Sequence, residues 1–465
     1  MSDALDLVVI GGGPAGLAAA VQARQLGLSV TLLDEQAEPG GQIYRAVERA
    51  EAEGRAAKLG EEYRHGLVLA KSFRACGATY LALHQVWQVE PDGHVYATDG
   101  AASRELAAQR VIVAVGAMER PVPIPGWTLP GVMSVGSAQI LLKTIGLTPG
   151  DGVWLAGSGP LALAYAAQVV ASGGKLEGFL DTSRYSRRLA ALAHWRGALQ
   201  GWRYISKGLA YYASLRAAGV RIIERVEAVE AAGEAHLERV RWRIGTKWEA
   251  APASGLLLHE GVIPNTHMTQ SIGCKHVWDA QQLCFRPVVD AFGATNVAAI
   301  FVAGDCGGIG GARVAEQRGR LAALGACASL GRIPATERDR LAAPVRRELV
   351  PHFAIRSFLD ALYPPAPELL SPADDVIACR CESVTAGRIR EAVAIGCRGP
   401  NQVKSFTRCG MGPCQGRMCG PTVTGTIAAA LDVNPSEVGG FRVRPPLKPL
   451  RLAELAALAD EARAA

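Results

Sequence analysis

The sequence predicts an α/β protein with two Rossmann-like dinucleotide-binding domains and a third, small and mainly helical domain rich in cysteine. Three observations support this fold class. Two glycine-rich turns, Gly11–Gly16 and Gly157–Ala162, each follow an apolar strand and open an Ala-rich helix, and six of the eleven cysteines lie between Cys379 and Cys419. With 465 residues, of which 49% are hydrophobic, the chain is long enough to bury the cores of two or three domains.

Composition and charge exclude several classes of protein. The net charge of +6 is small for this length, and no Lys/Arg run is long enough to follow a phosphate backbone, so nucleic acid is not an expected partner. No apolar stretch reaches the roughly 20 residues of a membrane-spanning helix. No secretory leader precedes the first apolar run, which predicts a cytoplasmic protein. An odd number of cysteines without an export signal favours metal or redox use over a disulfide framework.

The first glycine-rich turn belongs to a predicted βαβ unit, with strands at residues 6–10 and 30–34. Gly11 permits the tight turn, Gly13 lets the backbone approach a pyrophosphate, and Gly16 lets the helix pack closely on the strand. The helix N-terminus attracts phosphates, and Asp34 at the end of the second strand is placed to bind ribose hydroxyls. The alternative is a purely structural turn. The candidate ligand contacts are Gly11, Gly13, Pro14, Ala15, Gly16, Asp34 and Glu35.

The second glycine-rich turn follows a strand at residues 152–156 and is a G-x-G-x-x-A variant of the first. The next predicted strand ends at Asp181, which could hold a ribose and would repel a 2′-phosphate, so an occupied site would prefer NAD to NADP. A duplicated domain can also keep its fold after losing its ligand, and this alternative stays open.

Two further apolar strands end in small residues. Residues 111–117 end at the turn that contains Gly116, and residues 297–303 lead into Gly304 and Asp305. At the carboxyl edge of a parallel sheet, the carboxylate of Asp305 can accept hydrogen bonds from the polyol of a flavin. Taken alone, Gly304-Asp305 is also typical of a helix-capping turn.

In this order, the elements resemble the pyridine nucleotide-disulfide oxidoreductases, whose fold is that of glutathione reductase, over residues 5 to 330. The resemblance rests on the two glycine turns, Asp34, Pro39-Gly40-Gly41-Gln42, Val115-Gly116 and Gly304-Asp305. It implies FAD in a discontinuous first domain, residues 1–120 and 261–335, with the second domain inserted at residues 121–260. Gly41, Gln42, Gly116, Gly304 and Asp305 would line the flavin. No C-x-x-C pair lies beside Gln42, so dithiol chemistry is not expected.

A helix from about residue 336 to 362 and a proline-rich linker, together residues 336–371, lead to the cysteine-rich domain and C-terminal tail at residues 372–465. Cys379 and Cys381 form a C-x-C pair, and Cys409, Cys414 and Cys419 follow further on. Paired thiolates at two points of a chain hold an Fe–S cluster or structural zinc, and the C-x-C spacing is tighter than a zinc knuckle. Packed free thiols are the alternative.

This region resembles the [2Fe-2S] domain of bacterioferritin-associated ferredoxin. The resemblance implies four ligands, for which the sequence offers five candidates. We assign Cys379, Cys381, Cys414 and Cys419, and Cys409 remains the alternative to Cys419.

Both halves together resemble the A subunits of opine oxidases and the related subunits of hydrogen cyanide synthase and D-hydroxyproline dehydrogenase. The most specific stretches are residues 40–45, residues 273–279 and residues 409–420. The resemblance implies an electron-transferring FAD/[2Fe-2S] subunit, while an amino-acid-oxidase-like flavoprotein partner oxidises the C–N bond of an opine, imino acid or D-amino acid. It leaves room for a small ferredoxin-like subunit, for FMN at a subunit interface, and for NAD or another adenine nucleotide in the second domain.

No nucleophile system or convincing carboxylate pair is recognisable in the sequence, so the catalytic residues are not identified. Two alternatives to the electron-transferring subunit remain. One is a self-sufficient NAD(P)H:acceptor flavin reductase that uses both dinucleotide domains, and the other is a non-enzymatic iron–sulfur redox module.

Overall fold

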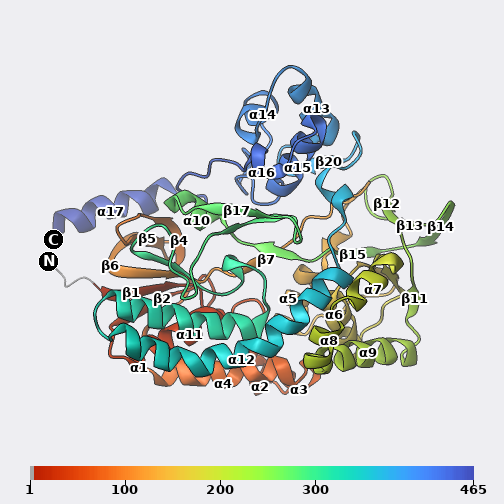
Figure 1. Ribbon diagram of the computed structural model, residues 1–465. Helices are drawn as coiled ribbons and strands as arrows, with labels where there is room; N and C mark the ends of the chain where they lie inside the picture. The colour runs from red at the N-terminus through yellow and green to blue at the C-terminus, as the bar shows by residue number, and fades with distance from the viewer. Residues whose placement is uncertain (1–4, 465) are drawn as a thin grey trace.

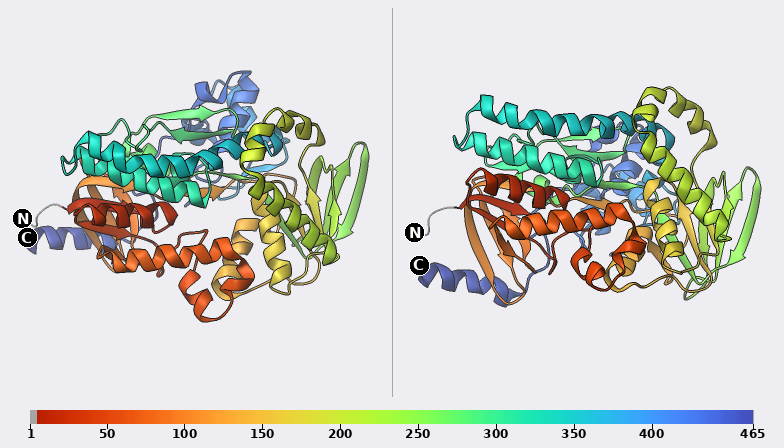
Figure 2. Two further views of the ribbon diagram at one scale, coloured as in Figure 1. Left: turned by 60° about the horizontal axis from the view of Figure 1, so that its bottom comes forward. Right: turned by 90° about the horizontal axis from the view of Figure 1, so that it is seen from below.

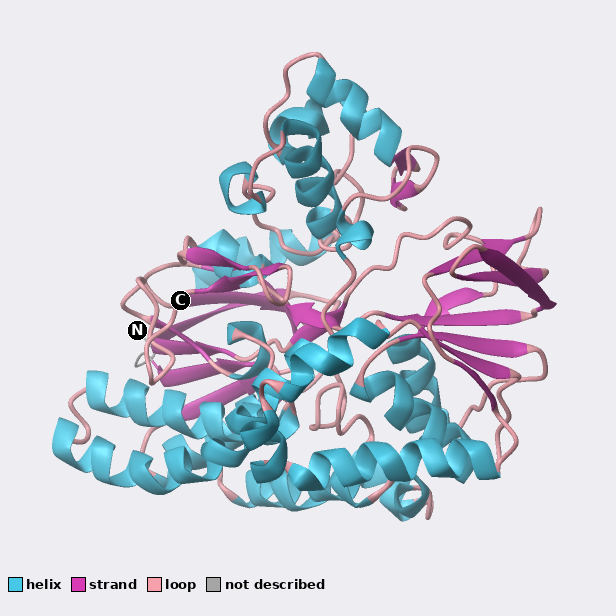
Figure 3. Ribbon diagram, turned by 45° about the vertical axis from the view of Figure 1, so that its right-hand side comes forward, coloured by secondary structure: helices cyan, strands magenta, loops and turns pink. Residues whose placement is uncertain are grey.

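The computed structural model describes residues 5–464, in which two α/β domains lie next to each other and a small helical domain stands over the junction between them (Figures 1 and 3). The fold class predicted from the two glycine turns is therefore confirmed for the two α/β domains. Figure 2, whose right-hand view is from below, shows the helices of the first domain packed as a layer in front of its sheet.

The first domain contains a seven-stranded sheet in the order β3-β2-β1-β6-β5-β4, with β19 also paired to β6. β1, β2, β3, β6 and β19 pair in parallel, whereas β4, β5 and β6 form an antiparallel meander that was not predicted from the sequence. β1 is apolar and buried because both faces of the sheet are covered. The strands are β1 (Leu5–Ile10), β2 (Val30–Leu33), β3 (Thr79–Leu81), β4 (Gln85–Val89), β5 (His94–Thr98), β6 (Ser103–Val113) and β19 (Ile300–Val302).

Helices cover the lower face of this sheet in the view of Figure 1. The helix α12 contains Pro344 and Pro351 and runs on towards the second domain. Neither α12 nor any other helix of the described chain has the length and apolar composition needed to cross a membrane. The helices are α1 (Pro14–Gln25), α2 (Val47–Ala52), α3 (Ala56–Leu59), α4 (Glu61–Ala75), α11 (Ala312–Ser329) and α12 (Ala335–Leu362).

Glycines bring backbone segments of the first domain into direct contact. A Cβ on Gly16 would lie 1.8 Å from the carbonyl oxygen of Gly11, and a Cβ on Gly319 in α11 would lie 2.0 Å from the carbonyl oxygen of Ala15 in α1. The predicted packing role of Gly16 is therefore confirmed. Because Ala15 lies at the start of α1 and Gly319 lies well inside α11, this contact sets the N-terminus of α1 against the middle of α11.

The second domain contains a parallel five-stranded sheet in the order β11-β10-β9-β15-β8 and a separate antiparallel sheet of β12, β13 and β14. The helices α7 to α9 connect β10 to β11, where the sequence predicted no particular structure. The strands are β8 (Val132–Ser134), β9 (Val153–Gly157), β10 (Gly178–Asp181), β11 (Arg221–Ile223), β12 (Ala228–Ala232), β13 (Arg239–Ile244), β14 (Lys247–Pro252) and β15 (Gly255–His259). The helices are α5 (Val135–Ile145), α6 (Pro160–Ala171), α7 (Tyr185–Leu192), α8 (Trp195–Gln200) and α9 (Trp202–Ala217).

The chain passes between the two domains through the paired strands β7 (Ala117–Glu119) and β16 (Val262–Pro264). Arg120 fixes this crossing, since its buried guanidinium donates hydrogen bonds to the carbonyl oxygens of Glu260 at 3.2 Å, Leu283 at 3.1 Å and Gln282 at 2.5 Å. It thereby ties the crossing strands to the hairpin formed by β17 (His276–Asp279) and β18 (Cys284–Pro287). The helix α10 (His267–Ile272) precedes this hairpin.

The cysteine-rich domain packs on the second domain through Trp127, whose indole N–H donates a 2.7 Å hydrogen bond to the carbonyl oxygen of Ile377. The chain then returns to the first sheet, where the hydroxyl of Thr98 donates to the carboxylate of Glu454 in α17 at 3.0 Å. The elements are η2 (Pro367–Leu370), β20 (Ile377–Cys379), β21 (Val384–Thr385), α13 (Ala386–Ala394), α14 (Pro400–Thr407), α15 (Gly420–Leu431), α16 (Pro435–Val438) and α17 (Leu452–Ala464).

A buried lysine lies where the two α/β domains meet. The ammonium of Lys143 in α5 donates hydrogen bonds to the carbonyl oxygen of Gln42 at 3.2 Å and the amide oxygen of Gln139 at 3.0 Å. Burial lowers its pKa to about 7, and the positive charge of Arg45 adds to this effect. Burial of the charged Lys143 side chain therefore lowers the stability of the fold, by an amount that depends on pH.

The contact between α1 and α11 predicts a large difference between two helical glycines. Gly319→Ala should lower the thermal unfolding midpoint by roughly 2–10 °C, because its methyl group must push the helices apart. Gly208→Ala in α9 is the matched control, since a Cβ there meets no atom within 4 Å and alanine favours a helix. Equal midpoints for the two variants would contradict this account of the packing.

The lowered pKa of Lys143 predicts that the free energy of unfolding depends on pH. The unfolded chain holds the lysine proton up to its ordinary pKa of 10.5, whereas the folded chain releases it above about 7, so stability rises with pH between these values. Lys143→Met should therefore gain stability relative to the parent at about pH 7, by an amount on the order of a few kcal/mol, and the gain should shrink towards about pH 10. Chemical denaturation across this range measures it, with Lys207→Met, whose lysine is paired with Glu62, as the control. A gain independent of pH would disprove the prediction.

Candidate functional site

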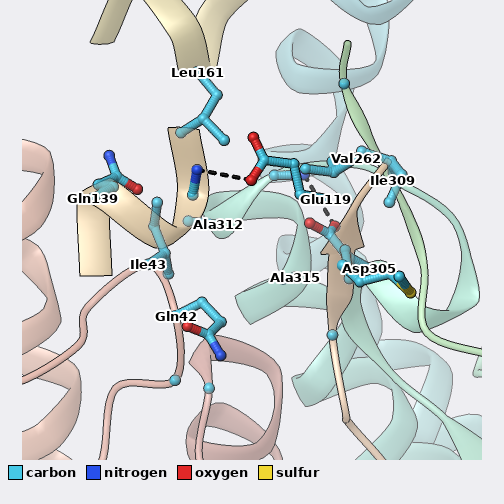
Figure 4. Close-up of a pocket in the computed structure, with 18 of the residues that line it drawn as sticks. Gln42, Ile43, Glu119, Gln139, Leu161, Val262, Asp305, Ile309, Ala312 and Ala315 are labelled. Atoms are coloured by element: carbon cyan, nitrogen blue, oxygen red, sulfur yellow. Dashed lines mark hydrogen bonds between the residues drawn. The ribbon is translucent and has the colours of Figure 1, made fainter. Parts of the chain in front are cut away.

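A cavity of about 1860 Å³ lies between the two α/β domains (Figure 4). It opens at the carboxyl ends of the parallel strands of the first sheet, which is where ligands bind in folds of this kind. Its volume exceeds the range of about 300–1,000 Å³ that is usual for one small-molecule site, so more than one ligand group can fit. Most of the predicted contacts line it, namely Gly11, Gly13, Pro14, Ala15, Asp34, Glu35, Gly41, Gln42, Gly116, Gly304 and Asp305.

The first glycine turn leaves a slot at the wall of this cavity. A Cβ on Gly13 would meet only the Cα of Gly41, at 3.8 Å, whereas a Cβ on Gly41 would lie 2.6 Å from the Cα of Gly13. The two loops therefore approach each other this closely because Gly41 has no side chain, and the space beside Gly13 stays open. The first-turn amides of α1 have no acceptor within the helix, which suits a pyrophosphate at this point. Gly16 lies beneath the turn, away from the cavity.

Asp34 stands at the end of β2, as expected for a ribose-binding acid. Its carboxylate accepts hydrogen bonds from the amides of Gly12 at 2.5 Å and Gln36 at 2.8 Å. Burial raises its pKa, and the two amide hydrogen bonds oppose that effect. The next acid, Glu35, forms an ion pair with Lys448 from the returning C-terminal segment.

Asp305 has the hydrogen bonds expected of a capping residue and also lines the cavity (Figure 4). One carboxylate oxygen accepts hydrogen bonds from the amides of Gly310 at 2.9 Å and Gly311 at 3.1 Å, just before α11 begins. This contact directs the N-terminus of α11 at the cavity. The two roles considered from the sequence are therefore compatible in one side chain.

A carboxylate–histidine pair that was not predicted from the sequence also lines the cavity. Glu119 accepts a 2.7 Å hydrogen bond from the amide of Gly136, and its other oxygen lies 2.6 Å from Nδ1 of His259 (Figure 4 shows Glu119). Both side chains are nearly buried and both residues line the cavity. No spacing pattern joins them, since 140 residues separate them. The one available signal was a histidine at the end of the apolar strand β15.

The second glycine turn also reaches the cavity, through Ser158 and Gly159. The carboxylate of Glu260 accepts hydrogen bonds from the hydroxyls of Ser158 at 3.2 Å and Thr182 at 2.5 Å, and burial raises its pKa. Asp181 accepts hydrogen bonds from the amide of Ser183 at 2.9 Å and the hydroxyl of Tyr212 at 2.8 Å. Both acids near the turn are thus already hydrogen-bonded within the chain.

Three cysteines of the C-terminal domain form a group that we call the cysteine triad. Sγ atoms of Cys379, Cys409 and Cys419 lie within 4.8 Å of one another, and all three residues are buried. The thiols of Cys409 and Cys419 lower the pKa of Cys379 to about 2, because they donate hydrogen bonds to its sulfur. The site therefore favours a thiolate, which is the form that binds metals and clusters.

Two further cysteines, Cys381 and Cys414, lie in contact with each other beside the triad. Their loops can approach closely because Gly412 has no side chain. A Cβ on Gly412 would fall 2.2 Å from the Cβ of Cys381. The structure thus brings all four assigned cysteines into one region and adds Cys409 to it. Together these thiols could hold a metal or a cluster.

The cysteine-rich domain also contributes to the wall of the cavity. Arg380, Cys414, Arg417 and Met418 line it together with the residues of the first glycine turn. The two candidate sites therefore open on the same space.

The chain matches two protein-family models. Residues 5–319 match the pyridine nucleotide-disulphide oxidoreductase model, and residues 379–459 match that of the sarcosine oxidase A3 domain. The solved structure of L-proline dehydrogenase from P. horikoshii has a similar fold, with a TM-score of 0.69 at 20% identity over 97% of this chain and 79% of that one.

Curated relatives extend over the whole chain. It is 45% identical to the A subunit of the opine oxidase of Rhizobium meliloti (strain 1021), covering 98% of this chain and 99% of the relative. It is 32% identical to the HcnB subunit of the hydrogen cyanide synthase of Pseudomonas aeruginosa, covering 98% and 99%. It also resembles the alpha subunit of the sarcosine oxidase of Corynebacterium sp. (strain P-1) at 28% identity, but spans only 45% of that protein.

These matches confirm the resemblance read from the motifs. The chain belongs to the FAD-dependent oxidoreductases of the pyridine nucleotide-disulphide oxidoreductase family and, over its full length, to the family of opine oxidase A subunits.

Proposed function

We propose that this chain is the electron-transferring FAD/[2Fe-2S] subunit of a heteromeric dehydrogenase. Its partner, an amino-acid-oxidase-like flavoprotein subunit, oxidises the C–N bond of an opine, imino acid or D-amino acid. The observation that carries the proposal is the shared cavity, on which both the first glycine turn and Cys414 open. Membership of an oxidoreductase family favours this role over that of a non-enzymatic redox module.

The first domain would hold FAD. The amides at the first turn of α1 would bind its pyrophosphate, Asp34 its adenosine ribose, and Asp305 its ribityl chain. The open slot beside Gly13 and the orientation of α11 towards the cavity support this assignment. Bound FAD can accept two electrons together and release them singly, which a one-electron cluster in the same assembly requires.

The cysteine-rich domain would hold one [2Fe-2S] cluster. We propose Cys379, Cys381, Cys414 and Cys419 as its ligands, with Cys409 as a neighbouring thiol. The short approach between Gly412 and Cys381 supports the assignment, because it brings the C-x-C pair to the loop that carries Cys414.

A self-sufficient NAD(P)H:acceptor reductase is the second candidate. It is favoured by the position of Ser158 and Gly159 on the same cavity. Against it, Asp181 is already engaged by Tyr212, and the carboxylate of Glu260 lies at the second turn, where it would repel a pyrophosphate.

The assignment of FAD to the first turn predicts opposite outcomes for two matched variants. Gly13→Val should lose most of its FAD, because the side chain would fill the slot that the pyrophosphate needs. Gly159→Val, at the corresponding position of the second turn, should keep it, although the φ of +93° there strains any side chain. Flavin released by heat and measured by fluorescence checks this, with far-UV circular dichroism to show that both variants fold. Retention in Gly13→Val with loss in Gly159→Val would place the cofactor on the other loop.

The cluster assignment predicts which cysteines are required. The parent should contain about two iron and two acid-labile sulfide per chain. Cys379→Ser, Cys381→Ser, Cys414→Ser and Cys419→Ser should each lose them, whereas Cys409→Ser should retain them. Cys397→Ser, a buried cysteine of the same domain, is the control. Loss in Cys409→Ser with retention in Cys419→Ser would exchange these two ligands, and stoichiometric zinc without iron would disprove the cluster.

Because C–N bond oxidation is assigned to the partner subunit, the chain alone should not oxidise the amine substrate. Opines, imino acids or D-amino acids should leave its flavin and iron–sulfur absorption oxidised in a stopped-flow experiment. Addition of the partner flavoprotein subunit with the same substrate should bleach both signals. Rapid reduction of the lone chain by NADH, with turnover to an artificial acceptor, would instead establish the reductase function.

A further inference from the structure

A buried cation without an acidic partner lies where the second domain meets the first. Lys143 is only 1% exposed, and it borders the cavity from helix α5. Among the described residues, its ammonium donates hydrogen bonds to neutral oxygens of Gln42 and Gln139 and forms no ion pair. Burial of this charge lowers the stability of the fold, so packing does not account for the lysine. A buried, perturbed charge on the wall of a ligand cavity indicates a functional group.

A series of side-chain hydrogen bonds fixes the ammonium of Lys143 in place. The amide nitrogen of Gln139 donates to the amide oxygen of Gln168 at 2.9 Å, so the amide oxygen of Gln139 is the atom that faces Lys143. The amide nitrogen of Gln168 in turn donates to the carbonyl oxygen of Leu59 at 3.0 Å. The amide of Gln139 cannot turn over without breaking these contacts. The position of the lysine charge is therefore set by the packing of α5 and α6.

Two cations converge on Gln42. Its carbonyl oxygen accepts the hydrogen bond from Lys143, and its side-chain oxygen accepts one from Arg45 at 2.9 Å. The surroundings of the two cations differ. Burial lowers the pKa of Arg45, while the carboxylates of Asp34 and Glu35 oppose that effect. Burial also lowers the pKa of Lys143, and there the like charge of Arg45 adds to the effect. The positive charge that lacks compensation at Gln42 is therefore that of Lys143.

This charge borders the space that the ring of the proposed FAD would occupy. Gln42 and Gln139 lie on the left of Figure 4, and Asp305, the proposed contact of the ribityl chain, lies on the right. The loop of Gln42 also abuts the proposed pyrophosphate site, since a Cβ on Gly41 would fall 2.6 Å from the Cα of Gly13. Because a charge in a site of low dielectric constant acts over several ångströms, the ammonium need not touch the ring to influence it.

Reduction changes the charge of a flavin. Two electrons from the reduced flavin of the partner subunit and one proton, which binds at N5, leave a negative charge shared by N1 and the oxygen on C2. When both electrons have passed singly to an iron–sulfur cluster, the proton leaves N5 and the ring is neutral again. A cation near N1 stabilises the reduced form relative to the oxidised form, and the reduction potential rises.

We propose that Lys143 supplies the positive charge that stabilises the reduced flavin, and thereby sets the potential at which this chain accepts electrons from its partner. The inference rests on the proposed binding of FAD at the first glycine turn. It gives a physical reason for a lysine that destabilises the fold while the cavity is empty, because the negative ring is the counter-charge that the chain itself does not provide.

Redox titration of the full-length chain with bound FAD, at about pH 7, tests the role of this charge. Lys143→Met should retain FAD, and its midpoint potential should fall by the equivalent of a tenfold or greater loss of stabilisation, which is about 30 mV for a two-electron couple. Lys143→Arg keeps the charge and should remain closer to the parent. Lys207→Met is the matched control, because Lys207 borders the same cavity but is paired with Glu62.

Sulfite binding provides a second measurement. Sulfite forms a bond from its sulfur lone pair to N5 of the oxidised ring, and the adduct carries a negative charge at N1 and the oxygen on C2. The dissociation constant for sulfite should therefore rise about tenfold or more in Lys143→Met and stay unchanged in Lys207→Met. A role in packing alone would change the unfolding midpoint but neither the potential nor the affinity for sulfite.

The possible failures are distinguishable. If the parent binds FAD and Lys143→Met changes neither the potential nor sulfite binding, the role of Lys143 is refuted and the proposed function stands. Equal changes in Lys143→Met and Lys207→Met would also refute it, because they would show a general field of the cavity. Loss of FAD from Lys143→Met would make the lysine a binding contact instead. A parent chain that cannot be loaded with FAD would refute both the inference and the proposed function.

Discussion

The close contact of backbone with backbone around α1 is the constraint on which the site depends. Gly16 lets α1 rest on the turn that precedes it, Gly319 lets α11 rest on α1, and Gly41 lets the neighbouring loop rest on Gly13. Each contact removes the space that one methyl group would need. Together they fix the N-terminus of α1 at the edge of the first sheet, and the position left open among them is the slot beside Gly13.

The buried carboxylates around the cavity are hydrogen-bonded to neutral groups of the chain. Asp34, Glu119 and Glu260 are carboxylates at or near its wall, and each accepts hydrogen bonds from backbone amides or hydroxyls of the chain. Their burial is therefore tolerated without a direct arginine or lysine partner. Lys143 is the contrasting case, since its ammonium has only neutral acceptors and its pKa falls to about 7. A ligand with negative charge would relieve that cost.

The features that could be predicted from sequence are those whose physical cause is local. The roles of Gly11 and Gly16 follow from a turn that spans six residues, and the structure has β1, α1 and β2 in that order. The antiparallel meander and the helices α7 to α9 could not be predicted in this way, because each is defined by packing against distant segments. Glu119 and His259 were missed for the same reason, since they form a recognisable pair only when the fold brings them together.

The cysteine-rich domain contains one feature that could be predicted from the sequence and one that could not. Their number and the C-x-C pair identified the region, because thiol density is a local property of the sequence. The contact of Cys409 with Cys379 required α13 and α14 to fold the chain back between them, and no spacing rule encodes that path. The same folding carries Cys414 to the wall of the cavity formed by the first domain. The opening of both candidate sites on one cavity is therefore a consequence of how three domains pack, whereas each candidate site separately is a consequence of its own loop.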